Sequence, residues 1–213
     1  MHRARQHSDS RNRERRNRLA QEAARLMAEG GIHDIHQAKL KAADRLGIHD
    51  EAALPRDGEI EVALREYQRL FSGTRQIDAL RVRREAAERA MAFLAAFSPR
   101  LVGPVLEGTA DAHSAVTLHV HTDDPGALVR FIEEHGIPAE GRMRRVRLDR
   151  QRTVDVDVWL FAAEDLTFDL TVLPEASLRQ APLSSGDDRP MRRMSHPQLR
   201  KLLTQEYGAP EAR

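Results

Sequence analysis

The chain has 213 residues, of which 40% are hydrophobic and 31% are charged, and its formal net charge is +1 at pH 7. This composition is typical of a globular protein with one sizeable domain or two small ones. Because the chain has no cysteine, disulfides, cysteine-ligated zinc and thiol chemistry are excluded. No apolar run approaches the ~20 residues of a membrane helix, and the N-terminus lacks the apolar segment of a secretory signal. We therefore expect a cytoplasmic protein without a membrane partner.

The first 18 residues are polar and rich in arginine. Residues 1–20 hold seven arginines and two acidic residues, and residues 1–18 show no apolar period. Such a segment buries too little apolar surface to order itself, so we predict a disordered basic arm over 1–18. Its positive charge makes nucleic acid a candidate partner for the arm, because arginine binds phosphate.

Helical periodicity dominates the chain from residue 19 to residue 100. Leu19, Ala23, Leu26 and Met27 repeat at helical spacing, and glycines and prolines divide the pattern into successive helices. We predict a helical module over 19–73 and a long connecting helix over 74–100.

Beyond Pro99 the apolar period changes from 3.6 to 2, which indicates a sheet. We predict this sheet over 101–175, with a first strand ending at Gly108 and a helix that starts at Pro125. Further strands are expected over 115–121, 154–160 and 166–172. Residues 176–213 are expected to form a loop and a C-terminal helix that starts near Ser195. The predicted fold class is α+β, with a helical N-terminal half followed by a small mixed β-sheet and one crossing helix.

Carboxylates alternate with apolar residues along the hairpin predicted over 154–172. The apolar residues of both strands have even numbers, whereas Asp155, Asp157 and Asp169 have odd numbers. If a loop of three or five residues joins the strands, the three carboxylates share one face. Carboxylates ~5 Å apart repel one another unless a cation neutralises them, and Mg²⁺ prefers such oxygen ligands. The competing interpretation is a solvated face, because half-buried strands alternate in the same way.

Polar residues also share one face of the strand predicted over 115–121. Its apolar face holds Val116, Leu118 and Val120, and its other face holds Ala115, Thr117, His119 and His121. An arginine-rich stretch over 142–152 precedes the carboxylate hairpin. These arginines could pair with the carboxylates or bind phosphate.

The region 101–174 resembles the DNA polymerase β-like nucleotidyltransferase superfamily. Members carry a Gly-Ser or Gly-Gly turn after a first strand, an Asp-x-Asp strand, and a third Asp on a later strand. In this resemblance Gly108-Thr109 would be the turn, 114–120 the metal strand, and Asp169 the third carboxylate. The chain departs from the pattern because Ala115 and Thr117 stand where the family has its paired Asp residues. Small bacterial proteins labelled nucleotidyltransferase-like, in which a helical module precedes such a sheet, are also similar.

The carboxylate face and the resemblance together give a set of site residues for an active protein, although Asp155 and Asp157 lie on a different strand from the paired Asp residues of the family. The family's carboxylates hold two Mg²⁺ ions that align a nucleoside triphosphate for transfer of its nucleotidyl group. Asp155, Asp157 and Asp169 would then be both catalytic residues and metal ligands. Substrate contacts would come from Gly108, Thr109, Ser114, Thr117, His119 and Arg144.

Two functions follow as expectations. The first is a nucleotidyltransferase-like protein, either active on a nucleoside triphosphate or catalytically degenerate. The alternative is a non-catalytic regulatory or binding protein that contacts a protein or nucleic-acid partner. Metal-dependent nucleotide binding would support the first, and metal-independent binding that is lost with the basic arm would support the second.

Overall fold

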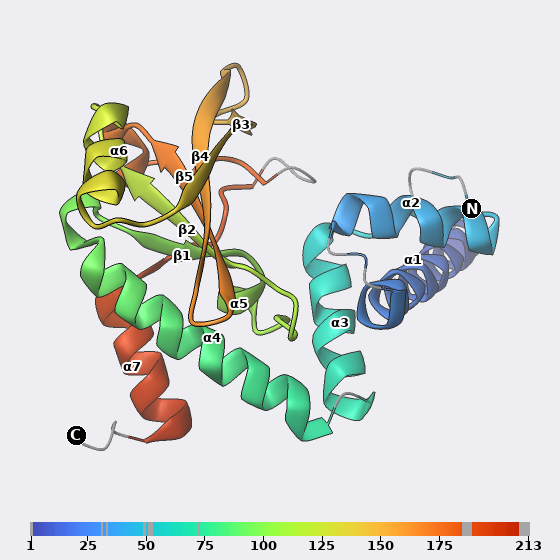
Figure 1. Cartoon of the computed structure of the whole chain (residues 1–213). Helices are drawn as coiled ribbons and strands as arrows, with labels where there is room; N and C mark the ends of the chain where they lie inside the picture. The colour runs from blue at the N-terminus through green and yellow to red at the C-terminus, as the bar shows by residue number, and fades with distance from the viewer. Residues whose placement is uncertain are drawn as a thin grey trace. The chain divides into compact units, whose positions relative to one another are not determined.

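The computed structural model describes residues 2–30, 32, 34–48, 50, 53–71, 73–184 and 189–208. Side chains of residues 2–11, 69–71, 73–75 and 125 lie outside this description. The chain divides into two compact units, Met1–Arg75 and Gln76–Arg213. Figure 1 shows the elements of both. None of the described helices is long and apolar enough to cross a membrane.

The first unit consists of helices α1 (His2–Gly30), α2 (Ile35–Leu46) and α3 (Asp57–Phe71). Both α2 and α3 contact α1. Their shared core is small and rich in alanine, and its most buried members are Leu19, Ala23, Ala38, Ala42 and Ile60. Residues 19–27 therefore pack as their helical period predicts.

The arginine-rich segment 2–18 lies in α1, where we predicted a disordered arm. Arginine and glutamine are good helix formers, and extending an existing helix is far easier than starting one. The packed part of α1 begins at Leu19, so the polar segment can continue a helix that tertiary contacts already stabilise. The composition of the segment taken alone could not reveal this support.

Gly47 ends α2 in a left-handed conformation that side chains disfavour. Its φ is +63°, and its N–H donates to the carbonyls of Ala43 and Asp44. Replacing Gly47 with alanine should lower the free energy of unfolding by about 1 kcal/mol, because an L-residue with a Cβ is strained in this region. Thermal unfolding followed by circular dichroism measures the change.

Gly58 gives a matched control within the same unit. It lies in the first turn of α3, has no positive φ, and has open space where a Cβ would stand. Gly58→Ala should therefore be neutral or stabilise by up to about 1 kcal/mol. Equal destabilisation by both variants would contradict the conformational explanation.

The second unit begins within α4 (Gly73–Phe93), which the short turn η2 (Ala95–Phe97) follows. The chain then forms β1 (Arg100–Val102), α5 (Gly103–Glu107), β2 (Val116–His121) and α6 (Pro125–Glu134). Next come β3 (Ala139–Arg147), β4 (Thr153–Ala163), β5 (Leu166–Leu173) and the turn η3 (Glu175–Leu178). The last elements are β6 (Met194–Ser195) and α7 (His196–Tyr207).

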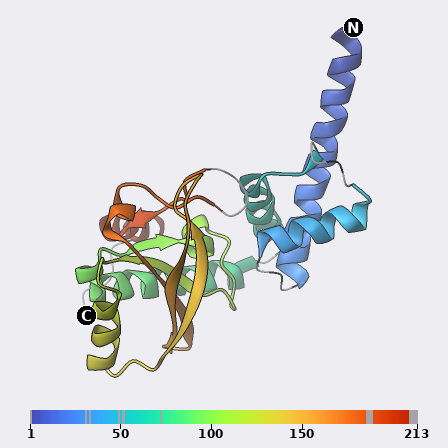
Figure 2. The same cartoon turned by 90° about the horizontal axis from the view of Figure 1, so that it is seen from above.

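The six strands form one mixed sheet in the order β3-β4-β5-β2-β1-β6. Only the pair β2–β5 is parallel, and every other neighbouring pair is antiparallel. Figure 2 shows β3 and β4 as a long twisted ribbon at the edge of this sheet. The α+β class, with a helical N-terminal half and a small mixed sheet, is therefore confirmed.

One face of the sheet, which we call the helical face, carries the main core. The predicted apolar face of 115–121 is confirmed, because Val116, Leu118 and Val120 all lie in this core. In register with them on β5 are Phe168, Leu170 and Val172. Residues of α4, α6 and α7 cover these side chains. The opposite face of β2 and β5, which we call the polar face, carries Thr117, His119, His121, Asp169 and Thr171.

The β4–β5 hairpin does not have the odd loop that we predicted. Ala163 pairs with Leu166, so a two-residue turn of Glu164 and Asp165 joins the strands, with φ of 51° and 62°. Positive φ at both positions is typical of a type I′ turn, whose twist matches that of the strands. Odd positions of β4 therefore share a face with even positions of β5.

The prediction failed because β4 buries apolar residues on both faces. Val154 and Val156 belong to a second small cluster with Leu148 and Leu173. Farther along β4, Trp159 and Phe161 pack against the main core of the helical face. A strand that changes its buried face cannot be assigned by counting the parity of its apolar residues.

The first strand is also shorter than predicted. β1 ends at Val102, and α5 then follows before Gly108. Gly103 turns the chain with a φ of +71°, and Pro104 lies in the first turn of the helix, where its missing N–H costs nothing. Gly108 caps the C-terminus of α5 with a φ of 79°.

Candidate functional site

The three predicted carboxylates do not share a face. Trp159 is in register with Leu170, so the odd positions of β4, including Asp155 and Asp157, lie on the side of the sheet that faces the helices. Asp169 lies on the polar face with Leu160 and Thr117 as its cross-strand neighbours. The expectation that the three side chains converge is therefore wrong, and the two-residue turn is the reason.

The carboxylates on both faces have arginine partners from β3. Asp155 accepts a hydrogen bond of 3.3 Å from Nε of Arg145, and both groups are exposed. Asp169 accepts two, of 3.1 and 2.6 Å, from Nη1 and Nη2 of Arg144. This fork geometry is the strong form of an arginine–carboxylate pair. The arginine-rich strand thus pairs with acids, one of the two uses that the sequence indicated.

The arrangement does not fit the predicted magnesium site. Among the described residues, no group of three or more histidine, aspartate or glutamate side chains could hold a metal ion. Asp169 is the one carboxylate of the predicted set on the polar face, and Arg144 already neutralises its charge. A hard divalent cation takes several oxygen ligands, which this single paired carboxylate does not supply.

Arg144 crosses the sheet to reach Asp169. Its own strand partner is Val156 of β4, yet Nη1 also donates to the Thr171 hydroxyl of β5, at 2.9 Å. The side chain therefore spans β4 on the polar face. Its side chain is 43% exposed, and its Nε–H donates to none of the described residues. The arginine thus joins β3 to β5 across the polar face.

Thr117 stands beside Asp169 at the centre of the polar face. The two residues are in direct register between the parallel strands β2 and β5. A Cβ added to Gly103 would lie 3.7 Å from both Cβ and Oγ1 of Thr117. Gly103, rather than Gly108, is therefore the glycine that approaches the polar face directly after the first strand.

The other predicted turn residues lie in the loop between α5 and β2, which is bound to α4. Gln76 of α4 donates to the carbonyl of Gly108, and Arg83 of α4 donates to the carbonyl of Ser114. The Ser114 hydroxyl donates to Asp111 within the same turn, at 2.8 Å. Thr109 is buried, and its N–H donates to the carbonyl of Pro104. None of these described contacts brings Gly108, Thr109 or Ser114 to Asp169.

His119 and His121 are buried on the polar face, only 4% and 3% exposed. Burial, together with smaller contributions from His121, Arg193 and Arg144, lowers the pKa of His119 to about 3. Burial also lowers the pKa of His121 to about 4, against the hydrogen bond of its ring to the Ser98 carbonyl. Both rings are therefore neutral at pH 7. Nδ1 of His119 and Nε2 of His121 have no hydrogen-bond partner among the described residues.

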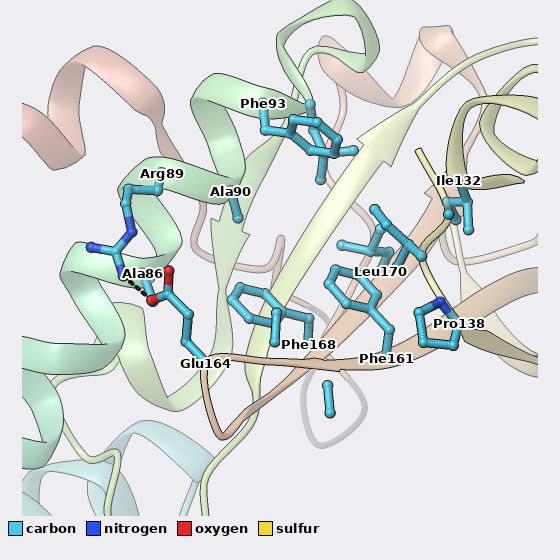
Figure 3. A pocket seen from close by; sticks show the side chains of 15 residues that line it. Ala86, Arg89, Ala90, Phe93, Ile132, Pro138, Phe161, Glu164, Phe168 and Leu170 are labelled. Carbon is cyan, nitrogen blue, oxygen red and sulfur yellow. Dashed lines mark hydrogen bonds and ion pairs between the residues drawn. The ribbon is translucent and has the colours of Figure 1, made fainter. Parts of the chain in front are cut away.

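A cavity of about 370 Å³ lies on the helical face, between α4, the end of α6 and the β4–β5 hairpin (Figure 3). Its lining is largely apolar, and Phe161 stacks on Phe168 with ring centroids 5.0 Å apart. The ion pair of Arg89 and Glu164 lies at one side of it. The cavity is separate from the polar face, because its sheet residues point to the helices.

Sequence reasoning missed three residues that the fold brings to this site. Gly103 could have been recognised, because a Gly-Pro pair directly after a short apolar strand is typical of a turn into a helix. Arg100 and Arg193 had no local signal. They reach the polar face only because β1 pairs with both β2 and β6.

The chain was compared with family models, with curated proteins and with solved structures, and none of the three comparisons found a match.

Proposed function

We propose that the chain is a nucleotidyltransferase-like protein with a degenerate metal site, which binds a nucleotide on its polar face without magnesium-dependent transfer. One observation carries this proposal. Thr117 is in strand register with Asp169, and Asp169 forms an ion pair with Arg144. In the family that the sequence resembles, the strand at the position of β2 supplies two carboxylates. Here Ala115 and Thr117 stand at those two positions, and neither is anionic.

The order of the strands is compatible with this resemblance. A first strand pairs antiparallel with β2, a glycine turn follows it, and β2 pairs parallel with the strand that carries Asp169. The glycine turn is then Gly103-Pro104, and the loop that precedes β2 is long enough for a helical turn. These features support a related sheet, and the missing carboxylates favour binding over catalysis.

Arg144 stands beside Asp169, where the resemblance would put metal ions, and because its charge is paired with Asp169 it offers a ligand a hydrogen-bond donor. A guanidinium has five N–H donors and binds phosphate oxygens well. In this chain its hydrogen bonds to described residues come from Nη1 and Nη2, so Nε–H can donate to a ligand. The hydroxyl of Thr117 lies on the same face and can also donate to phosphate.

Calorimetric titration tests the proposal. ATP and GTP should bind the wild-type protein with Mg²⁺ and with EDTA alike, and neither should release pyrophosphate. Arg144→Ala should weaken binding about tenfold or more, because it removes a charge-assisted hydrogen bond. Arg145→Ala is the matched control, because this neighbour on β3 also pairs with an aspartate but on the opposite face. It should bind like the wild type.

Two other outcomes of these titrations would each point to a different function. Binding that requires Mg²⁺, with pyrophosphate release that an Asp157→Ala/Asp169→Ala variant loses, would replace this proposal with an active nucleotidyltransferase. No binding of either nucleotide, also with Mn²⁺, would leave a non-catalytic protein that contacts a protein or nucleic-acid partner.

A further inference from the structure

A second group of cations lies on the polar face, beyond Asp169. Arg100 of β1 is in register with His119 of β2, and Arg193 directly precedes β6, which pairs with β1. Both arginines act electrostatically on His121. The cluster of Arg100, Arg193 and His121 is thus assembled from three parts of the chain, and the proposed nucleotide site described above does not use it.

The two guanidinium groups of this cluster have no carboxylate partner among the described residues. Arg100 donates from Nη1 to the carbonyls of Ser98 and Pro99. Arg193 donates to the carbonyls of Ser177 and Leu178. Carbonyl oxygens satisfy the N–H groups but carry no net charge to offset the cations.

Mutual repulsion makes this cluster a candidate for an anion. Burial and the nearby Arg100 both lower the pKa of Arg193. Two half-buried cations that disfavour each other are stabilised when an anion binds between them. By contrast, the same positive charge argues against a metal ion on the adjacent histidines.

His121 contributes a buried ring nitrogen without a partner. Its Nδ1 lies 3.0 Å from the carbonyl oxygen of Ser98, which can only accept, so Nδ1 carries the proton of the neutral ring. Nε2 is then an acceptor, and no described group donates to it. Such a nitrogen becomes a donor only when it takes up a proton, and a nearby anion favours that proton.

We propose that Arg100, Arg193 and His121 bind a tetrahedral dianion, and that Nε2 of His121 takes up one proton from solvent as the anion binds. The protonated Nε2 donates to an anion oxygen while Nδ1 keeps its bond to Ser98. The dianion is the terminal phosphate of the bound nucleotide, an identification that rests on the function proposed above.

The charges around His121 set the direction of the pH dependence. His119 on its own strand, Arg100 on β1 and Arg193 before β6 all face it, and Arg144 of β3 acts on His119. None of these groups is an anion, so protonation is unfavourable in the free protein and depends on the ligand. Linkage then requires that the anion binds more tightly as the pH falls.

Sulfate is the suitable probe, because it stays a dianion where a phosphate monoester titrates near pH 6. Titration calorimetry in buffers of different ionisation enthalpy should show about one proton taken up for each sulfate bound. Affinity should rise by up to about tenfold for each unit of pH decrease between pH 8 and pH 6. Sulfate that binds without proton uptake, or does not bind, would overturn the inference.

Single substitutions distinguish sulfate binding at the cluster from sulfate attraction to exposed arginines elsewhere. Arg100→Ala and Arg193→Ala should each weaken sulfate binding about tenfold or more. Arg192→Ala is the matched control, because the neighbouring guanidinium pairs with Glu107, and it should bind sulfate like the wild type. Arg193 also donates hydrogen bonds to two backbone carbonyls of η3. Far-UV circular dichroism must therefore show that the Arg193→Ala variant is folded. Arg100→Ala tests the cluster without touching those carbonyls.

His121→Asn tests whether His121 is the group that takes up the proton when the anion binds. The asparagine amide can keep the donor to Ser98 but lacks the second nitrogen, so proton uptake should fall to near zero while the fold is retained. Unchanged proton uptake would refute the role of His121.

ATP titrations of the same preparations distinguish the two proposals. ATP binding that depends on Arg144, without sulfate binding, would remove this inference alone. Proton-linked sulfate binding without ATP binding would remove the proposed function alone.

Discussion

Replacing Asp57 with alanine should lower the free energy of unfolding of the helical unit by about 3 kcal/mol, because it leaves a buried charge without a partner. Asp57 accepts a hydrogen bond of 2.7 Å from Nζ of Lys39. The side chains are 12% and 10% exposed, respectively, so water replaces the lost partner only in part. The pair also joins α2 to the start of α3. Chemical denaturation of the full chain, followed by circular dichroism, measures the loss.

Two further variants test whether the unpaired charge is the cause. Asp44→Ala removes an exposed aspartate from α2 and should change stability by less than about 0.5 kcal/mol. A Lys39→Met/Asp57→Leu variant replaces both charges by apolar groups and should recover most of the loss. If the double variant is as unstable as Asp57→Ala, packing rather than charge explains the effect.

The helices of the N-terminal half could be predicted because their sequence signals are local. Leu19 and Ala23 recur at the helical period and are fully buried. Gly47 ends α2, as expected of a glycine that follows an amphipathic segment. The change of period after Pro99 likewise located the sheet, and Ser195 is the N-cap of the last helix. In each case a few consecutive residues contain the whole signal.

The positions of the three carboxylates could not be predicted, because the prediction assumed that β4 buries only one of its faces. Parity assigns a face only when a strand buries one side, and β4 buries Val156 on one face and Trp159 packs on the other. The turn of Glu164 and Asp165 lacks the glycine that usually marks a type I′ turn, so its length had no clear sequence signal. One residue of difference in that loop moves Asp169 to the opposite face from Asp155.

The arginine cluster depended on contacts between distant parts of the chain. Arg100 and Arg193 are brought to one face by a two-residue strand pairing, in which Arg100 lies opposite Ser195. A strand as short as β6 has no periodicity from which it could be predicted. By contrast, Thr117 and His119 were predicted on one face because they lie two positions apart on the same strand.

The second large effect that we expect is a loss of stability in acid, which originates at His119 and His121. Their pKa values in the folded protein are about 3 and about 4, below the ordinary value of 6.5 for an unfolded chain. Below pH 6.5 the unfolded state therefore binds protons that the folded state excludes. Stability that is fully present above pH 6.5 is lost as the pH falls toward 3. At pH 4 we expect the two histidines together to cost the folded state several kcal/mol.

Denaturation curves between pH 7.5 and pH 4 should reveal this loss as a difference between variants, because acidic groups elsewhere titrate equally in each of them. A His119→Gln/His121→Asn variant should lose several kcal/mol less than the wild type across that range, whatever its stability at pH 7.5. His113→Gln, which alters an exposed histidine in the loop before β2, should follow the wild-type profile. If the double variant and the wild type lose stability in parallel, the two rings are not held neutral by burial. The polar face would then be open to water, and the proton uptake proposed for His121 would lose its physical basis.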